Sequence, residues 1–264
     1  MASLSLGTAS FGTAYGIANA GRPSEFDVAR ILLEAGGRVP HLDTAPAYAC
    51  QRLLGRYMSP GAFRVTTKTK DGKDLFHTLT ELRRRTLYAA LLHDPESLEV
   101  WPELVAFRAA GWVDKVGVAC YTEDDIGRAM DLDPRPDVIQ VPVNVLDGRL
   151  WGLLPELHEK GVEIHARSVF LQGLILMDPD ALPAFAQPAE GQLRRFQRSC
   201  GKRGLSPAAG ALGYVLGLPF VDVAVVGVDS LAQLDEALGA APLHFNQEFC
   251  VQDEAVLDPR RWTK

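Results

Sequence analysis

The sequence has few cysteines and no arrangement of side chains typical of a metal site. Its 264 residues include four cysteines, which lie far apart and form no CxxC pair: Cys50, Cys120, Cys200 and Cys250. Several histidines also show no metal-ligand spacing: His41, His77, His158 and His244. These spacings exclude a disulfide framework and a structural zinc site, and they favour a reducing compartment. We therefore expect no bound metal.

Long apolar runs and an excess of basic residues are also missing. The longest apolar stretch, Leu212–Val228, contains Pro219 and Asp222 and is shorter than the roughly 20 residues that cross a membrane. Met1–Gly12 has no basic region followed by an apolar one, so we expect no secretion signal. With 27 Lys and Arg against 33 Asp and Glu, the net charge of −6 offers no surface for nucleic acid. We expect a cytoplasmic protein without membrane or nucleic-acid partners.

The sequence instead alternates short apolar runs with longer amphipathic stretches. Eight apolar runs predict strands: Leu4–Leu6, Val39–Leu42, Phe63–Thr67, Tyr88–Leu92, Val113–Val118, Val138–Val141, Val162–Ala166 and Val223–Val228. Six amphipathic stretches predict helices: Ser24–Ala35, Asp124–Met130, Arg149–Lys160, Gln192–Arg203, Ser206–Leu216 and Ser230–Leu238. Strands that are apolar throughout indicate a parallel sheet buried on both faces.

Eight such strands in about 240 residues predict an α/β fold, a (β/α)8 TIM barrel that forms a single domain over residues 1–264. No linker or low-complexity tract divides the chain. A doubly wound open sheet is the alternative, but no GxGxxG motif follows the first strand, as its dinucleotide sites usually require.

Chemistry in such a barrel occurs at the carboxyl ends of the strands. Asp43 directly follows the second predicted strand, with Tyr48 in the next loop, and Lys68 and His93 end the third and fourth strands. A phenol has a pKa of about 10, which a nearby ammonium group lowers. A phenol, an ammonium group, a carboxylate and an imidazole together suit proton delivery to a carbonyl oxygen. Because no side chain donates hydride, this chemistry implies a nicotinamide cofactor.

The sequence resembles the aldo-keto reductase family over nearly its whole length. The similar segments are Leu6–Gly12, Leu42–Tyr48, Leu54-Gly55, Thr66–Lys68, Leu91–Pro95, Val116–Val118, Ile139–Asn144 and Val226–Val228. Three further segments are similar to a bacterial branch often linked with surface-polysaccharide and other sugar biosynthesis: Tyr15–Asn19, Asn144–Arg149 and Arg167–Gly173. The resemblance implies reduction of a small, sugar-like carbonyl compound.

The family resemblance also implies roles for particular residues. It assigns the catalytic tetrad to Asp43, Tyr48, Lys68 and His93, with Tyr48 as general acid. The residues implied to bind NADP(H) or NAD(H) are Asp43, Gln140, Arg167, Ser168, Phe170, Gly227, Asp229, Ser230 and Gln233.

Several positions depart from the family pattern around the cofactor. Ala119-Cys120 replaces the usual Ser-Asn pair, and Arg167 stands near the usual position of an aromatic that stacks on the nicotinamide. Asp229 stands where many members have an arginine that binds the 2′-phosphate of NADPH, and Ala237 where they have an asparagine. A carboxylate repels a phosphate but suits a ribose hydroxyl, so the sequence leaves the choice between NADPH and NADH open.

Other side chains leave alternatives open. Tyr15 could line the substrate pocket or only pack in its loop, whereas Trp101 and Trp151 could line the pocket or cover the barrel rim. Cys120 could be a reactive thiol or a small apolar filler. We expect His165, inside a strand, to have a structural role.

Two alternatives to a reductase also remain. One is a regulatory or binding protein with weakened cofactor binding, similar to potassium-channel β subunits. The other is a lyase or isomerase that uses the tetrad without a nicotinamide.

Overall fold

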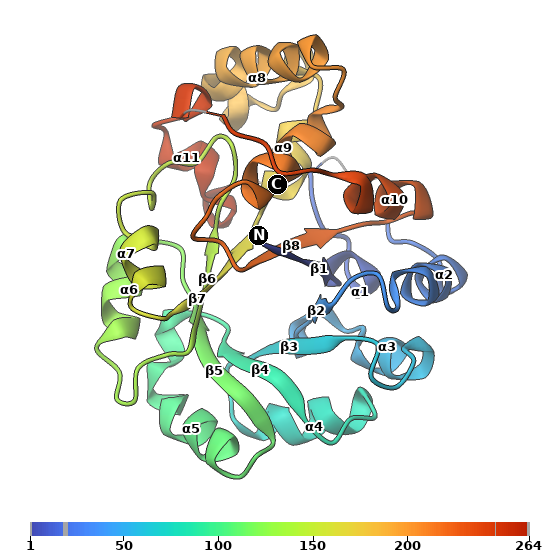
Figure 1. Ribbon diagram of the computed structural model, residues 1–264, viewed down its shortest axis with the longest axis vertical. Helices are drawn as coiled ribbons and strands as arrows, with labels where there is room; N and C mark the ends of the chain where they lie inside the picture. The colour runs from blue at the N-terminus through green and yellow to red at the C-terminus, as the bar shows by residue number, and fades with distance from the viewer. Residues whose placement is uncertain (1, 18–20, 246, 263–264) are drawn as a thin grey trace.

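Eight parallel strands close into a barrel in the order of the chain (Figure 1). The computed structural model describes residues 2–17, 21–245 and 247–262, so Ala18 and Asn19 of the segment Tyr15–Asn19 lie outside the described residues. The strands are β1 (Ser3–Gly7), β2 (His41–Asp43), β3 (Arg64–Thr69), β4 (Leu87–Leu92), β5 (Val113–Ala119), β6 (Val138–Pro142), β7 (Glu163–Arg167) and β8 (Val223–Gly227). β1 pairs with both β2 and β8 and so closes the barrel. The predicted barrel is confirmed, and the open-sheet alternative is wrong.

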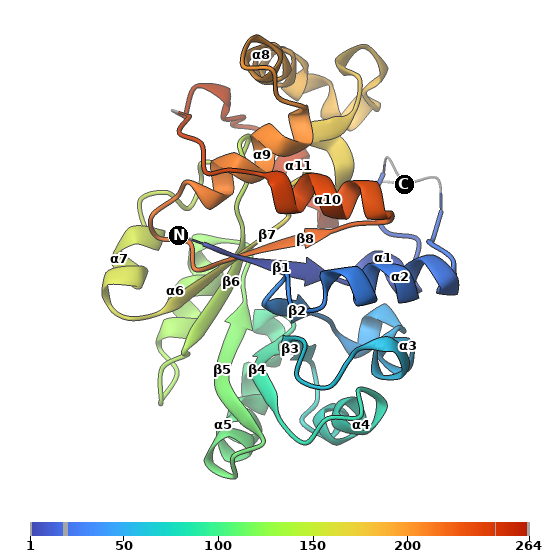
Figure 2. The same ribbon diagram turned by 45° about the vertical axis from the view of Figure 1, so that its right-hand side comes forward.

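Helices surround this barrel (Figures 1 and 2). They are α1 (Ala9–Gly12), α2 (Glu25–Ala35), α3 (Gln51–Tyr57), α4 (Lys73–Glu81), α5 (Trp101–Ala109), α6 (Glu123–Met130), α7 (Leu154–Glu159), α8 (Glu190–Lys202), α9 (Pro207–Leu216), α10 (Leu231–Gly239) and α11 (Glu254–Leu257). Serine caps begin three of these helices: Ser24, Ser206 and Ser230 each accept a hydrogen bond from a backbone N–H three residues on. No helix of the described residues combines the length and apolar character that crossing a membrane requires.

Among the local predictions that differ from the structure are a helix start and the place of Lys68. The helix predicted over Arg149–Lys160 begins only at Leu154, because Pro155 has no N–H and fits only the first helical turn. Lys68 lies within β3 and does not follow it, since the strand continues to Thr69. Both differences leave the order of the elements unchanged.

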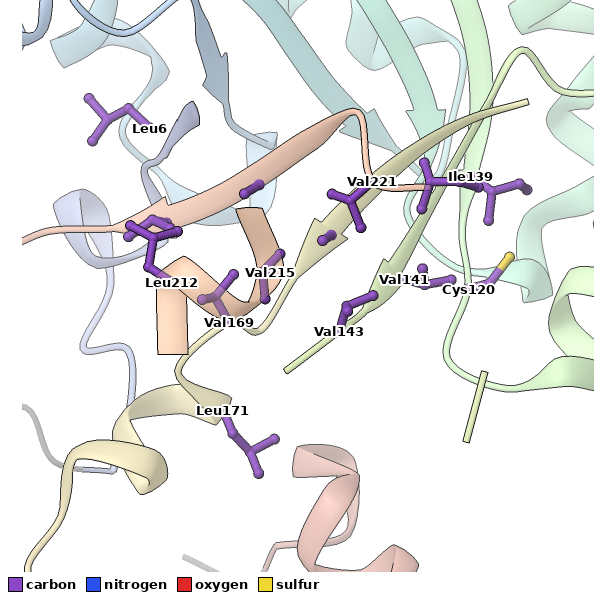
Figure 3. Packing of buried hydrophobic residues seen from close by; sticks show 14 of the residues in the cluster. Leu6, Cys120, Ile139, Val141, Val143, Val169, Leu171, Leu212, Val215 and Val221 are labelled. Atoms are coloured by element: carbon purple, nitrogen blue, oxygen red, sulfur yellow. The ribbon is translucent and has the colours of Figure 1, made fainter. Parts of the chain in front are cut away.

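Most of the hydrophobic core lies between the strands and the surrounding helices. Figure 3 shows part of it, with Ile139 and Val141 from β6, Leu212 and Val215 from α9, and Val169 from the loop after β7. These side chains are all at most 1% exposed. Because alternate residues of a strand face opposite sides, the other face of each strand is free to carry polar groups into the barrel.

Candidate active site

Three predicted tetrad residues meet at the carboxyl ends of β2 and β3. Asp43 ends β2, and Lys68 of β3 donates a hydrogen bond to its Oδ1. The Lys68 Nζ also lies 3.5 Å from the Tyr48 hydroxyl oxygen. Asp43 and Lys68 are both almost completely buried. The pair therefore presents a fixed ammonium group to the phenol.

Tyr48 is positioned by a short helical turn, η1 (Pro46–Tyr48), that follows β2. The next residue, Ala49, has a left-handed backbone conformation with φ 53°, which ends the turn. Gly12 of α1 packs directly against this segment, and a Cβ at that position would lie 1.9 Å from the carbonyl oxygen of Tyr48. Only glycine therefore allows α1 and the Tyr48 turn to approach so closely.

Burial decides the protonation states of this group. It raises the pKa of Tyr48 above its ordinary value of 10.0, and the opposing effect of Lys68 is smaller. The lowering effect expected of the ammonium group is present, but burial outweighs it. For Lys68, burial disfavours the charge, but the Asp43 carboxylate and Tyr48 outweigh it and raise the pKa. At neutral pH the arrangement is a neutral phenol beside a charged ammonium group, which leaves the phenol able to donate a proton.

His93 follows β4 and lies edge-on to Tyr48, with 6.2 Å between the ring centroids. Burial, together with the positive charge of Lys68, lowers the pKa of His93 to about 4. Its imidazole is therefore neutral at physiological pH. The structure thus brings all four predicted tetrad residues together.

A cavity of about 510 Å³ extends from the tetrad along the ends of β1, β7 and β8. Asp43, Tyr48 and Lys68 line it, whereas His93 does not. Seven further residues predicted to bind the cofactor line it too: Gln140, Arg167, Ser168, Phe170, Gly227, Asp229 and Gln233. Ser230 is not part of the lining and instead caps α10 through the backbone N–H of Gln233. The predicted residues are thus grouped around one cavity, apart from His93 and Ser230.

Two buried polar atoms of the lining residues have no hydrogen-bond partner among the described residues. The Gln140 side chain is fixed by its Nε2, which donates to Asp43 Oδ2 at 2.9 Å, while its Oε1 has no donor. Ser10 Oγ of α1 is also without a partner. Burying such atoms is unfavourable unless another group satisfies them. A carboxamide such as that of a nicotinamide could donate to Gln140 Oε1, so the cavity fits this cofactor.

The loop after β7 forms one side of the cavity in an unusual backbone conformation. Ser168, Leu171 and Gln172 have positive φ values of 58°, 46° and 53°, and Gly173 follows at 94°. Such conformations are unfavourable for residues other than glycine and occur often at functional sites. This tight path brings Ser168, Phe170 and Gln172 to the lining.

The structure also resolves the alternatives left open for single side chains. Tyr15 lines the cavity, whereas Trp101 and Trp151 do not. Burial raises the pKa of the Cys120 thiol far above its ordinary value, so this side chain is an inert filler and not a nucleophile. His165 lies inside the barrel, where its Nε2 forms a hydrogen bond of 2.6 Å with Oε1 of Glu163. This is the structural role expected of it.

A stack of side chains beside the cavity was not predicted from the sequence. Arg167 and Arg260 each place their guanidinium carbon 3.8 Å from the ring centroid of Tyr121. Arg260 lies in the C-terminal turn η7 (Pro259–Arg261), and nothing in the sequence links it to Tyr121.

Comparisons with known proteins agree with this geometry. The family model for the aldo/keto reductase family matches residues 3–257. The glycerol dehydrogenase AKR11B4 from Gluconobacter oxydans superposes with a TM-score of 0.73 at 19% identity, over 93% of this chain and 88% of that one. PA4992 from Pseudomonas aeruginosa gives a TM-score of 0.66 at 19% identity, over 90% and 87% of the two chains. No curated protein sequence matches. The chain belongs to the aldo/keto reductase family and is an NAD(P)H-dependent oxidoreductase.

Proposed function

We propose that this enzyme reduces the carbonyl group of a small, polar, sugar-like compound, with Tyr48 as the general acid. The observation that carries the proposal is the neutral Tyr48 phenol held beside the buried Lys68–Asp43 pair at the wall of a cavity. The sugar-like substrate is supported by the resemblance of Asn144–Arg149 and Arg167–Gly173 to the sugar-linked bacterial branch.

The proposed step moves one proton at the phenol. Tyr48 donates its hydroxyl proton to the carbonyl oxygen as hydride reaches the carbonyl carbon. The Lys68 ammonium stabilises the phenolate that remains, and Asp43 keeps the ammonium charged and in place. The neutral His93 ring, packed edge-on against Tyr48, helps to hold the phenol in position.

The nicotinamide supplies the hydride when it is bound. We assign its carboxamide to Gln140, because the Oε1 of this buried side chain has no donor among the described residues. The loop from Ser168 to Phe170 and the start of α10 would hold the remainder of the cofactor, with Gly227, Asp229 and Gln233 at the far end of the cavity.

We further propose a preference for NADH over NADPH. Asp229 and Glu236 line the cavity at the end of β8 and along α10, and the only cations in the described lining are Lys68 and Arg167. Carboxylates that line the cavity would repel a 2′-phosphate, whereas a carboxylate can accept hydrogen bonds from a ribose hydroxyl.

Replacing Tyr48 by phenylalanine tests the proposal. We expect Y48F to lower kcat for reduction of para-nitrobenzaldehyde by roughly a hundredfold or more, because the proton donor is lost. The Kd for NADH, measured by quenching of tryptophan fluorescence, should remain close to that of the wild type. Y57F is the matched control, since the Tyr57 hydroxyl donates to Glu25 away from the cavity. Reduction by Y48F at the wild-type rate would show that Tyr48 is not the acid.

A further inference from the structure

Arg167 is a fixed cation at the wall of the active-site cavity. It ends β7, where one guanidinium nitrogen donates to the Cys120 carbonyl oxygen at 3.0 Å and another to Ser168 Oγ at 3.3 Å. Its guanidinium also stacks on Tyr121. All three partners are neutral, and Arg167 forms no ion pair with a carboxylate of the described residues. The side chain is therefore oriented, but its charge is not neutralised.

The other arginine on Tyr121 makes the contrast clear. Arg260 donates hydrogen bonds to both carboxylate oxygens of Asp258, with Nε 2.9 Å from Oδ1 and Nη2 2.8 Å from Oδ2. It does not line the cavity, whereas Arg167 does. Of the two guanidinium groups on this ring, the one that faces the cavity is the one without a carboxylate. A rigid, partly desolvated guanidinium is well suited to bind a carboxylate through two hydrogen bonds.

The charge of Arg167 acts on the reacting end of the cavity. Burial raises the pKa of Tyr15 to about 12, and Arg167 partly opposes that rise, as it does for Tyr48. The guanidinium therefore lies within electrostatic reach of both phenols. An anionic group of a substrate whose carbonyl meets Tyr48 would find its counter-charge within the same cavity.

We propose that Arg167 binds a carboxylate of the substrate, so that the enzyme acts on acidic carbonyl compounds such as sugar acids. This assignment rests on the proposed function and adds the charge of the substrate to it. This assignment replaces the role in cofactor binding that the family resemblance implied for Arg167. A cofactor diphosphate is the other anion that a cavity cation could meet, and the test separates the two.

The test compares two aldehydes that differ only in charge, para-formylbenzoate and its neutral methyl ester. We expect the wild type to show a higher kcat/KM for the carboxylate. R167Q should lower kcat/KM for the carboxylate by at least about tenfold and change that for the ester by less than about threefold. R167K keeps the charge and should retain part of the preference for the carboxylate over the ester. The Kd for NADH should be the same in all three proteins.

Two results would overturn the assignment. A higher Kd for NADH in R167Q, with equal losses for both aldehydes, would assign Arg167 to the cofactor. If R167Q kept the wild-type ratio of the kcat/KM values for the two aldehydes, the guanidinium would have only a packing role. Binding of benzoate to the protein, followed by tryptophan fluorescence, provides a readout without turnover. If neither aldehyde is reduced but benzoate binding still depends on Arg167, the carboxylate site stands and the proposed reduction fails.

Discussion

At the scale of single residues, burial controls the chemistry of the tetrad. The phenol of Tyr48 keeps its proton because desolvation disfavours the phenolate more than Lys68 favours it. His93 stays neutral for a related reason, since burial and the nearby ammonium both disfavour imidazolium. The order of Asp43, Tyr48, Lys68 and His93 at the strand ends was enough to predict that they meet. The sequence could not predict the net direction of the Tyr48 pKa shift, because this direction depends on solvent exclusion that no sequence pattern encodes.

The carboxylate of Asp229 leads to a prediction about the cofactor. We expect the wild type to bind NADH more tightly than NADPH. In D229N, the ratio of the Kd for NADPH to the Kd for NADH should fall by about tenfold, because one repulsive charge is removed. Fluorescence titrations with both nucleotides measure the ratio. D235N is the control, since Asp235 lies on α10, just after Asp229 in the chain, but is exposed and outside the cavity. Tighter binding of NADPH by the wild type would contradict the prediction.

At the scale of elements, β7 carries polar side chains at both ends of the barrel. Glu163, His165 and Arg167 alternate along the strand and therefore share a face. Glu163 accepts hydrogen bonds from Tyr88 at 2.8 and 2.9 Å and from His165, and it pairs with Lys115. This cluster lies at the opposite end of the barrel from Arg167. One strand thus supplies a structural network at one end and a cavity side chain at the other.

The Glu163 network makes a prediction about stability and pH. Burial alone would raise the pKa of Glu163, but hydrogen bonds from His165 and Lys115 outweigh it and lower the pKa to about 2. Because the folded-state pKa lies below the ordinary value of 4.5, the ionised Glu163 stabilises the fold fully above about pH 4.5. This contribution is lost as the pH falls from there towards 2.

We therefore expect E163Q to lower the free energy of unfolding by about 2 kcal/mol at pH 7, since hydrogen bonds to a charged group are lost. Urea denaturation at pH 7 and at lower pH measures the difference from the wild type, which should shrink below pH 4.5. E159Q, which removes the same charge from an exposed position on α7, should unfold like the wild type at pH 7. Equal stability of E163Q and the wild type at pH 7 would show that the Glu163 network does not stabilise the fold.

Local sequence was sufficient to predict helix starts but not contacts between distant segments. The caps Ser24, Ser206 and Ser230 act through neighbours three residues away, so the helices they begin could be predicted. The stack of Arg260 on Tyr121 joins residues far apart in the chain. Contacts of that kind depend on how the completed barrel brings its loops and C-terminal segment together, which local patterns do not specify.

At the scale of the whole molecule, closure of the barrel creates the site. Every strand runs in the same direction, so all eight carboxyl ends lie on one side, and a single cavity can be lined from β1, β2, β3, β6, β7 and β8. The alternation of apolar runs predicted this architecture because each buried strand needs cover on both faces. The shape of the cavity could not be predicted, since it depends on the left-handed path of the loop after β7.

The most direct test of the account follows hydride through this cavity. The enzyme is incubated with para-formylbenzoate and NADH that carries deuterium at both C4 positions of the nicotinamide, and the alcohol product is examined by mass spectrometry. We expect one deuterium on the former carbonyl carbon, with the transfer strongly reduced in Y48F. Nucleotide binding without any transfer would instead indicate a binding protein. Conversion of a sugar without added nucleotide, and with no deuterium transfer to the aldehyde, would indicate a lyase or isomerase, and either result would contradict the account.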